Sequence, residues 1–430
     1  MILRDPVHGL VAFETPEEEV VERLMDTPEV QRLRRVRQLG VTSLAFPGAE
    51  HSRFAHAIGA AFVMKLLLVR LRAIHGVLPE SQRVTEERGR EALAAAFLHD
   101  LGHGPLSHLF EDTIPGAPPH ETWTERVVLD PSTGVHQVLA SVDPALPSRV
   151  VDLVHGRHSL PYLAKAVSGE FDVDRCDYLL RDAHATGVRY GVYDLDWLLR
   201  SLRFAPLEDA ASAPALAIDG AKGLPAIEAF ITARLFMFQQ VYLHKATRAA
   251  EWMIRTILGR AVGVLRGGGR LEAAPAALVA GARGELVALR DYLELDDGVL
   301  WGAMHAWEEA KDRPLADLAR RIRGRALFKT LELFGEHATV EGRGRALSIA
   351  RDVAVSRGLD GEAYVGLDVA SDEPFGGQGG PLMVVYAKGP ARPLHEVSFL
   401  LGRLAGQVLS RVRLVLAPEL REPVTHALGV

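Results

Sequence analysis

The sequence predicts a mainly α-helical protein that ends in a small α+β unit. Up to about Phe334, apolar residues recur at helical spacing between residues that start or stop helices. After Gly335 the pattern changes to short runs of β-branched and apolar residues. The length of 430 residues is enough for more than one domain. We therefore expect a helical domain over residues 1–334 and an α+β domain over residues 335–430.

The helical domain is expected to consist of helices joined by short loops. Thr27 and Pro28 provide an N-cap followed by a proline at the first helical position, and Gly102 and Gly104 end the helix before them. Residues 203–224 and 266–275 are rich in Ala, Pro, Asp or Gly and are expected to form loops or hairpins. The expected helices are Glu17–Met25, Pro28–Leu39, His56–His75, Glu86–His103, Val173–His184, Ile227–Leu258 and Leu315–Arg325.

The C-terminal domain is expected to combine strands and helices, which is typical of an α+β unit packed on a helical body. Its expected strands are Tyr364–Val369, Leu382–Ala387 and Val412–Leu416. An apolar helix, Leu394–Leu409, is expected between the second and third strands, and Glu419–Leu428 follows the third.

Composition excludes several classes of protein. The net charge of −6 does not indicate a protein built to coat nucleic acid, and the single cysteine, Cys176, excludes an intramolecular disulfide or a multi-thiolate metal site. No apolar run reaches the length of a membrane-spanning helix, and the first residues lack the pattern of a secretory signal. We expect a cytoplasmic protein without a membrane segment.

The stretch F-L-H-D-L-G-H-G-P-L-S-H, residues 97–108, places ionisable groups at the end of an apolar helix. His99 and Asp100 would lie on its last turn, and His103 one turn beyond on the same face. A buried carboxylate must be paired or bind a metal to avoid a cost of several kcal/mol. An isolated His–Asp pair is more often structural, but the density of histidines here favours a functional site.

Two further segments could contribute to the same site. In H-S-R-F-A-H, residues 51–56, Arg53 and His56 are three apart and can share a helical face. In E-F-D-V-D-R-C-D-Y-L-L-R-D, residues 170–182, one helical face would carry a carboxylate, a phenol, a guanidinium and a second carboxylate. These are Asp174, Tyr178, Arg181 and Asp182. The alternative for this segment is a solvated face with pairs such as Asp177–Arg181.

Four of these residues form a set of two imidazoles and two carboxylates: His56, His99, Asp100 and Asp174. Such a set suits Fe, Mn, Zn, Ni or Mg, and a metal bound there would lower the pKa of its water and offset charge on a phosphoryl group. Three more histidines could orient water, protonate a leaving oxygen or hold phosphate. They are His103, His108 and His120.

The motifs resemble those of the HD-domain phosphohydrolases, and in particular the deoxynucleoside triphosphate (dNTP) triphosphohydrolases. The likeness is closest to the animal SAM-and-HD-domain enzyme and its bacterial relatives, without the SAM domain. It runs in order from Asp5 to about Arg248 through D-P-V-H-G, D-T-P-E-V-Q-R-L-R-R-V-R-Q-L-G, F-P-G-A-E-H-S-R-F-A-H, H-D-L-G-H-G-P-L-S-H and D-V-D-R-C-D-Y-L-L-R-D. The resemblance implies a helical HD-domain phosphohydrolase fold and hydrolysis of a dNTP to deoxynucleoside and inorganic triphosphate.

The resemblance also implies roles for individual residues. The metal would be held by His56, His99, Asp100 and Asp174, while Mg or Mn would accompany the substrate. His103, His108 and His120 would line the catalytic pocket, with His108 as general acid toward the departing 5′ oxygen. Arg53, Arg175 and Arg234 would contact phosphate, Gln38, Tyr178 and Asp182 would surround the sugar, and Tyr242 would stack against the deoxyribose.

Regulation is a further implication of the resemblance. Asp26, Gln31 and Arg34 stand where similar enzymes recognise a guanine nucleotide between subunits. The resemblance therefore implies an activator, dGTP or GTP, and assembly into homodimers or homotetramers. The alternative for the basic side chains within Pro28–Leu39 is a solvated face.

Departures from the family pattern leave two other functions open. Arg175 replaces the usual phosphate-binding lysine, Phe238 replaces a histidine, and Gln239 and Gln240 replace two arginines. The last three of these changes reduce the positive charge near the expected polyphosphate position. A smaller positive charge would suit an HD-family phosphohydrolase of nucleoside monophosphates or other phosphoesters. The basic segment Pro28–Leu39 would instead suit a nucleotide sensor or a single-stranded nucleic-acid binder, a function that the sequence does not favour.

Overall fold

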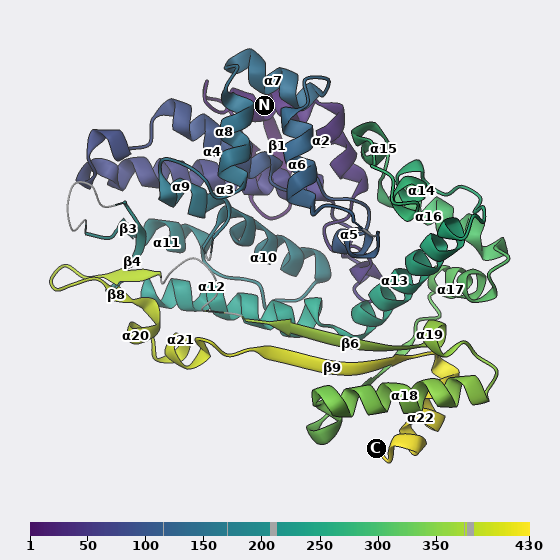
Figure 1. The fold of residues 1–430 in the computed structure, drawn as a ribbon. Helices are drawn as coiled ribbons and strands as arrows, with labels where there is room; N and C mark the ends of the chain where they lie inside the picture. The colour runs from purple at the N-terminus through teal and green to yellow at the C-terminus, as the bar shows by residue number, and fades with distance from the viewer. Residues whose placement is uncertain (115, 170, 207–212, 374, 376–381) are drawn as a thin grey trace.

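A computed structural model shows a helical body with two of its three small sheets along one side (Figure 1). The structure describes residues 1–114, 116–169, 171–206, 213–373, 375 and 382–430, and the side chains of His108 and Asp112 also lie outside the described part. The mainly α-helical class with a C-terminal sheet region is confirmed. Among the described residues, no helix is both long and apolar enough to cross a lipid bilayer.

The first half of the chain packs around one hydrophobic core. Its longest helix, α3 (Arg53–Ile74), packs against α4 (Glu86–Leu98) and α10 (Val173–Thr186). Each of the three helices buries small or aliphatic residues, such as Ala60, Ala95 and Leu179. The other helices here are α1 (Glu19–Met25), α2 (Pro28–Arg32), α5 (His108–Thr113), α6 (His120–Leu129), α7 (Gly134–Val142), α8 (Leu146–Val154), α9 (Pro161–Val167), α11 (Leu195–Arg200) and α12 (Leu224–Met237).

A second core follows, built on α13 (Lys245–Arg266). It receives α17 (Arg313–Arg323) and the strands β5 (Lys329–Glu332), β6 (Val365–Asp372) and β9 (Leu409–Leu416). The other helices of this part are α14 (Ala276–Ala282), α15 (Leu289–Leu293), α16 (Asp297–Ala306), α18 (Val340–Ser356), α19 (Gly361–Tyr364), α20 (Leu394–Val397), α21 (Phe399–Leu404) and α22 (Arg421–Leu428).

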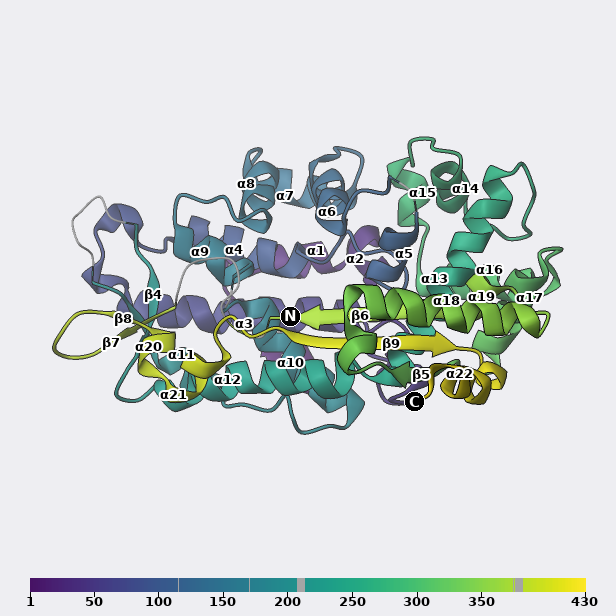
Figure 2. The same cartoon turned by 60° about the horizontal axis from the view of Figure 1, so that its bottom comes forward.

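The three-stranded sheet is antiparallel, with β9 between β5 and β6 and Leu331, Leu414 and Leu367 in register. Figure 2 shows this sheet with α18 and α22 beside it. A second sheet has the order β3 (Leu202–Phe204), β4 (Leu216–Asp219), β7 (Met383–Val385), β8 (Arg392–Pro393). The hairpin expected within 203–224 is therefore joined by a C-terminal strand. A third sheet pairs β1 (Ile2–Asp5) with β2 (Gly9–Ala12).

Strands from both sides of residue 334 pair with one another, since β5 lies before it and β6 and β9 lie after it. The division of the chain into domains of residues 1–334 and 335–430 stays a prediction.

Several helix ends differ from the sequence predictions. The helix predicted over Pro28–Leu39 stops at Arg32, and one 3₁₀ turn follows. Residues 36–38 become extended because they pair with residues 51–53: the Val36 carbonyl accepts from the Arg53 amide at 2.9 Å, and the Gln38 amide donates to the His51 carbonyl at 3.0 Å. Helix α3 then starts at Arg53, three residues earlier than predicted, with the Ser52 hydroxyl capping it.

Two long helices were wrongly predicted as continuous. In Ile227–Leu258, a π-helical turn over Phe238–Tyr242 ends α12, and extended His244 caps α13 by accepting from the Ala246 amide. In Leu394–Leu409, Ser398 leaves the helical region and caps α21, and strand β9 begins at Leu409. Local apolar spacing does not reveal such breaks.

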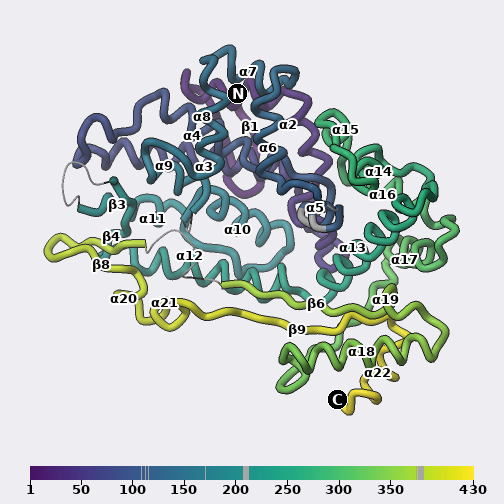
Figure 3. Tube along the Cα trace, viewed as in Figure 1, coloured from purple at the N-terminus to yellow at the C-terminus, as the bar shows by residue number. Residues whose placement is uncertain are grey.

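The segment between α4 and α5 lies where the two cores meet. Leu101 belongs to the first core, whereas Leu106 and Leu109 belong to the second. Helix α5 packs against α13, and the tube in Figure 3 shows the two helices side by side. This segment carries the histidines of the F-L-H-D-L-G-H-G-P-L-S-H stretch.

Candidate metal centre and adjoining cavity

The structure brings together the side chains of His56, His99, Asp100 and Asp174, as the sequence predicts. The Nε2 atom of His56 lies 3.1 Å from Asp174 Oδ1, 3.3 Å from His99 Nε2 and 3.7 Å from Asp100 Oδ2. His99 Nε2 lies 3.4 Å from Asp100 Oδ1 and 3.5 Å from Asp174 Oδ1. The four donor atoms therefore face one small region. Asp174 is 32% exposed, while the His56 side chain is fully buried, so a ligand would approach from the Asp174 side.

Both imidazoles are oriented with Nε2 toward that region. The Nδ1 atom of His99 donates to the Ala96 carbonyl at 2.9 Å, and Nδ1 of His56 donates to Asp177 Oδ2 at 2.8 Å. In the neutral form, each ring then directs the lone pair of Nε2 at the carboxylates. One ligand atom each of His56, His99 and Asp174 lies within 4.8 Å of the others, and Asp100 forms a second such group with His103 and His120. Imidazole nitrogens and carboxylates of this kind fit a divalent cation.

Asp177 holds His56 in place through Nδ1, the ring nitrogen that faces away from the other candidate ligands. Its carboxylate also contacts His8 Nε2 at 2.7 Å and accepts two hydrogen bonds from Arg181, at 2.7 and 2.8 Å. Arg181 in turn donates to Asp5 at 2.8 Å. The predicted pair Asp177–Arg181 therefore forms, but it is buried instead of solvated. Sequence reasoning missed the contact of Asp177 with His56.

Ion pairs outweigh burial in setting the protonation states of the four side chains in this centre. Burial alone would lower the pKa of His56, but hydrogen bonds to Asp174 and Asp177 raise it to about 10. Burial is likewise outweighed at His99, whose pKa rises to about 9 beside Asp100 and Asp174. The pKa of Asp100 lies below its ordinary range because Arg53, His99 and His103 outweigh its burial. The pKa of Asp174 is lowered because His56 and His99 outweigh its burial. The centre thus favours ionised carboxylates, the form that holds a cation, and the two histidines would release their protons when a cation binds.

A second cluster joins the first through Asp100. His103 Nε2 lies 3.3 Å from Asp100 Oδ1, and the rings of His103 and His120 stack at 3.6 Å. Glu111 lies within 3.4 Å of both rings. Burial and the Arg53 charge lower the pKa of His103 to about 4, so its ring is neutral. His108 begins α5, but its side chain lies outside the described residues.

The loop from His99 to Ser107 is held in an unusual backbone conformation. The helix predicted to reach His103 ends at Leu98, so His103 does not lie one helical turn beyond His99. Leu106 and Ser107 have φ angles of 56° and 59°, which non-glycine residues rarely adopt. Gly102 packs against the His120 carbonyl and Thr124, where a Cβ atom would clash.

Side chains from other segments fasten this loop. Buried Arg32 donates twice to the His103 carbonyl, at 2.8 and 2.7 Å, and the Tyr292 hydroxyl donates to the Gly102 carbonyl at 2.7 Å. Asp297, at the start of α16, accepts from the Leu106 amide at 2.9 Å. Arg53 donates to the Asp100 carboxylate and, at 2.7 Å, to the Ser107 hydroxyl.

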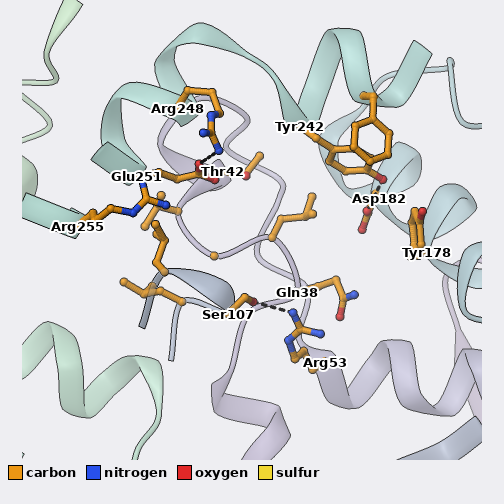
Figure 4. A pocket seen from close by; sticks show the side chains of 16 residues that line it. Gln38, Thr42, Arg53, Ser107, Tyr178, Asp182, Tyr242, Arg248, Glu251 and Arg255 are labelled. Atoms are coloured by element: carbon orange, nitrogen blue, oxygen red, sulfur yellow. Dashed lines mark hydrogen bonds and ion pairs between the residues drawn. The ribbon is translucent and has the colours of Figure 1, made fainter. Parts of the chain in front are cut away.

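A cavity of about 340 Å³ adjoins the centre through Arg53 (Figure 4). Three of the predicted sugar-binding residues, Gln38, Tyr178 and Asp182, line it together with Tyr242. Tyr242 donates to Asp182 at 2.7 Å, and His51 contacts the other oxygen of the same carboxylate at 2.8 Å. Phe238 lies edge-on to Tyr242 in the cavity wall. His51 is a neighbour that sequence reasoning missed.

Two predicted phosphate contacts do not line this cavity. Arg175 binds the Asp172 carboxylate and the Gly169 carbonyl. Arg234 donates to Asp372 and to the Glu373 carbonyl, both at 3.0 Å. Their charges are therefore engaged within the protein.

The three residues predicted to bind an activator lie near the start and end of α2. Gln31 donates to the Met25 carbonyl and accepts from Arg34, both at 2.7 Å, while Arg34 packs on the Phe54 ring. Asp26 and Arg34 are exposed. A separate cavity of about 260 Å³ has a basic lining that includes Lys245, Arg325, Lys329 and Arg421.

Comparison with known proteins identifies a matching family model and several relatives of this chain. The family model described as HD domain matches residues 53–182, a span that contains all four candidate metal ligands. The uncharacterized protein YwfO of Bacillus subtilis is 35% identical over 374 residues, which cover 87% of this chain and 80% of YwfO. Human deoxynucleoside triphosphate triphosphohydrolase SAMHD1 is 31% identical over 218 residues, which cover 44% of this chain and 34% of SAMHD1.

The fold is also similar to a solved structure along its whole length. The crystal structure of a phosphohydrolase from Bacteroides thetaiotaomicron superposes with a TM-score of 0.80 at 27% identity, covering 97% of this chain and 99% of that one. The similarity to SAMHD1 spans only about a third of that protein, so its activity does not transfer by itself.

Proposed function

The chain belongs to the HD-domain family, and we propose that it is a metal-dependent triphosphohydrolase that converts dNTPs to deoxynucleoside and inorganic triphosphate. The observation that carries the proposal is the position of the His56, His99, Asp100 and Asp174 centre beside the cavity that contains Gln38, Tyr178, Asp182 and Tyr242. A metal centre supplies phosphoryl chemistry, and the cavity supplies a place for a sugar.

In this proposal the His56, His99, Asp100 and Asp174 side chains hold a divalent cation. Such a cation lowers the pKa of a coordinated water and offsets the charge that builds on phosphoryl oxygens. Arg53, next to Asp100, contacts the phosphate nearest the sugar. Neutral His103, with His120 stacked on it, orients water, and His108 protonates the departing 5′ oxygen.

The cavity wall would position the nucleoside. Asp182 is fixed by His51 and Tyr242 and accepts a hydrogen bond from the 3′-hydroxyl, with Gln38 and Tyr178 on the same sugar. The Tyr242 ring, braced edge-on by Phe238, packs on the deoxyribose face and leaves little room for a 2′-hydroxyl.

Product analysis tests the proposal. Purified protein is incubated with each common dNTP and Mn²⁺ or Mg²⁺, with and without GTP or dGTP, and the products are separated by anion exchange. We expect equal amounts of deoxynucleoside and inorganic triphosphate. Absence of triphosphate under every condition would contradict the proposal.

A second candidate is hydrolysis of nucleoside monophosphates or other phosphoesters. It is favoured by one observation: Arg175 and Arg234 bind acidic or carbonyl groups of the protein and do not line the cavity, which thins the positive charge for a polyphosphate. Release of orthophosphate from monophosphates, without triphosphate from dNTPs, would support this alternative.

We extend the main proposal to activation by dGTP or GTP in a homodimer or homotetramer. The exposed side chains of Asp26 and Arg34, with Gln31 bonded to Arg34, support a nucleotide contact. The basic cavity lined by Lys245 and Lys329 supports a phosphate-binding position. If neither nucleotide changes the rate in the same assay, the proposed activation is contradicted.

The third function open from sequence, a nucleotide sensor or nucleic-acid binder, loses support. Arg32 is buried, Arg35 pairs with Asp296 at 2.5 Å, and Arg37 pairs with Glu50 at 2.5 Å. These contacts neutralise much of the basic segment on which that function depended.

A further inference from the structure

The cavity continues well beyond the residues assigned to the sugar. Figure 4 shows Tyr178, Asp182 and Tyr242 on one side and Thr42, Arg248, Glu251 and Arg255 on the other. Aliphatic side chains also line the cavity: Leu39, Val41, Leu106 and Leu109. Apolar walls with one polar end are the chemistry that a flat heteroaromatic ring requires, since its faces are apolar and its edge forms hydrogen bonds.

The polar end is held rigidly by the C-terminal sheet. Arg248 Nη1 donates to Glu251 Oε2 at 2.6 Å, and its Nε and Nη2 atoms donate to Asp368 Oδ1 at 3.0 and 2.5 Å. Asp368 lies on β6 and its side chain is only 4% exposed. Because Arg248 is fixed from β6, the Glu251 carboxylate is oriented before any ligand binds.

The charges at this end largely cancel, although Arg413 Nη1 lies 3.8 Å from Asp368 Oδ2 and adds one further positive charge. Arg248 and Arg255 contribute two positive charges, and Glu251 and Asp368 contribute two negative charges. A polyphosphate would gain little there, because each guanidinium has a carboxylate close by. A neutral group with both donors and acceptors fits better.

We propose that Glu251 and Arg255 bind the edge of the nucleobase and favour guanine. Two adjacent N–H donors of guanine, N1–H and the 2-amino group, match a carboxylate, and its O6 or N7 acceptors match a guanidinium. Adenine, cytosine and thymine do not offer such a donor pair. The proposal rests on the proposed function, because it places the nucleoside in the same cavity.

Binding of product nucleosides tests the proposal without requiring turnover. Calorimetry compares 2′-deoxyguanosine with 2′-deoxyinosine, which lacks only the 2-amino group, on the wild type, Glu251→Gln and Glu309→Gln. Glu309 is 87% exposed and serves as the matched control. We expect the wild type and the control to bind deoxyguanosine about tenfold more tightly, the size of one bidentate base contact, and Glu251→Gln to lose this preference.

Equal affinity of the wild type for the two nucleosides would overturn the proposal, whether or not Glu251→Gln folds. Retained preference in a folded Glu251→Gln protein would also overturn it. The failure of the proposed function is distinguishable: no triphosphate from any dNTP, with the deoxyguanosine preference intact, contradicts the reaction but not the base contact. Triphosphate release without base preference contradicts only the base contact.

Discussion

At the scale of single residues, Asp177 determines how His56 is presented. The carboxylate receives hydrogen bonds from His56, His8 and Arg181 in a fully buried position. Gly59, opposite it on α3, cannot carry a Cβ atom without touching Asp177. A ligand whose second nitrogen is fixed in this way keeps its tautomer and its direction.

Sequence spacing could reveal only part of this arrangement. The pair Asp177–Arg181 follows from an i,i+4 spacing, whereas His56 and His8 are 121 and 169 residues away from Asp177. The motif D-P-V-H-G contributes Asp5 and His8 to this network, a structural contribution that the motif itself does not show. The four ligand types were predictable because their chemistry is specific, but their supporting contacts were not.

Asp177→Asn is expected to lower the free energy of unfolding at pH 7 by about 3 kcal/mol, because the buried Arg181 loses one of its two ionised partners and keeps only Asp5. Arg181 and the two histidines hold the pKa of Asp177 well below 3.8 despite its burial. The stabilisation is therefore present above pH 4 and is lost as the pH falls through the folded-state pKa. Urea unfolding of both proteins in chelator, from pH 7 to pH 3, measures the difference.

The difference in unfolding free energy should narrow below about pH 4, where the unfolded carboxylate also takes up its proton. Exposed Asp196→Asn is the control and should change stability little at any pH. A difference that is constant from pH 7 to pH 3 would show that Asp177 is not ionised in the folded protein.

At the scale of elements, the loop between α4 and α5 is strained and is held from outside. Leu106 and Ser107 both have positive φ angles, and Asp297 accepts a hydrogen bond from the Leu106 amide at one oxygen and from the Arg37 amide at 3.0 Å at the other. One carboxylate thus connects the loop, the extended segment after α2 and helix α16.

Helix periodicity predicted the existence of these elements better than their ends. The apolar run before His99 marks α4 correctly, but the helix stops at Leu98, where Gly102, Tyr292 and Arg32 redirect the chain through tertiary contacts. The same holds for the π turn after α12, since the sequence around Phe238 reads as uninterrupted helix. Such ends depend on contacts between distant segments, which a local pattern does not contain.

Asp297→Asn is expected to act through the loop instead of through the substrate. Asparagine keeps the size of the side chain but has an NH₂ group in place of one carboxylate oxygen. That NH₂ group would face the N–H of either Leu106 or Arg37, so one of the two hydrogen bonds is lost. We expect kcat for phosphohydrolysis to fall about tenfold to a hundredfold, with KM and metal content nearly unchanged, because positioning errors of about 1 Å have effects of this size.

Asp296→Asn is a matched control, because Asp296 caps α16 by accepting from the Val299 amide and asparagine is an equally good cap. The variant also loses the ion pair with Arg35, but Arg35 is 60% exposed and such a pair contributes little to stability. A parallel loss of metal content and thermal stability in Asp297→Asn would indicate general structural damage and would contradict a positioning role.

At the scale of the whole molecule, the candidate centre depends on segments that are distant in the chain. Its ligands come from α3, from the end of α4 and from α10, and its cavity is completed by α13 and braced by Asp368 on β6. The two hydrophobic cores meet at this place. The sequence alone predicts the C-terminal part less well, because its strands pair with strands that come before residue 334. Strand β4, for example, pairs with β7, which is far from it in the chain.

The metal content of the purified protein tests the central claim most directly, because it requires all three ligand segments to assemble. Mass spectrometry after loading with Mn²⁺ or Fe²⁺ and desalting should find about one tightly held divalent ion per chain in the wild type and in exposed Asp196→Asn. His56→Ala, Asp100→Ala and Asp174→Ala should lose the ion and the phosphohydrolase activity together. No retained ion in the wild type, or full occupancy in folded Asp174→Ala protein, would contradict the account.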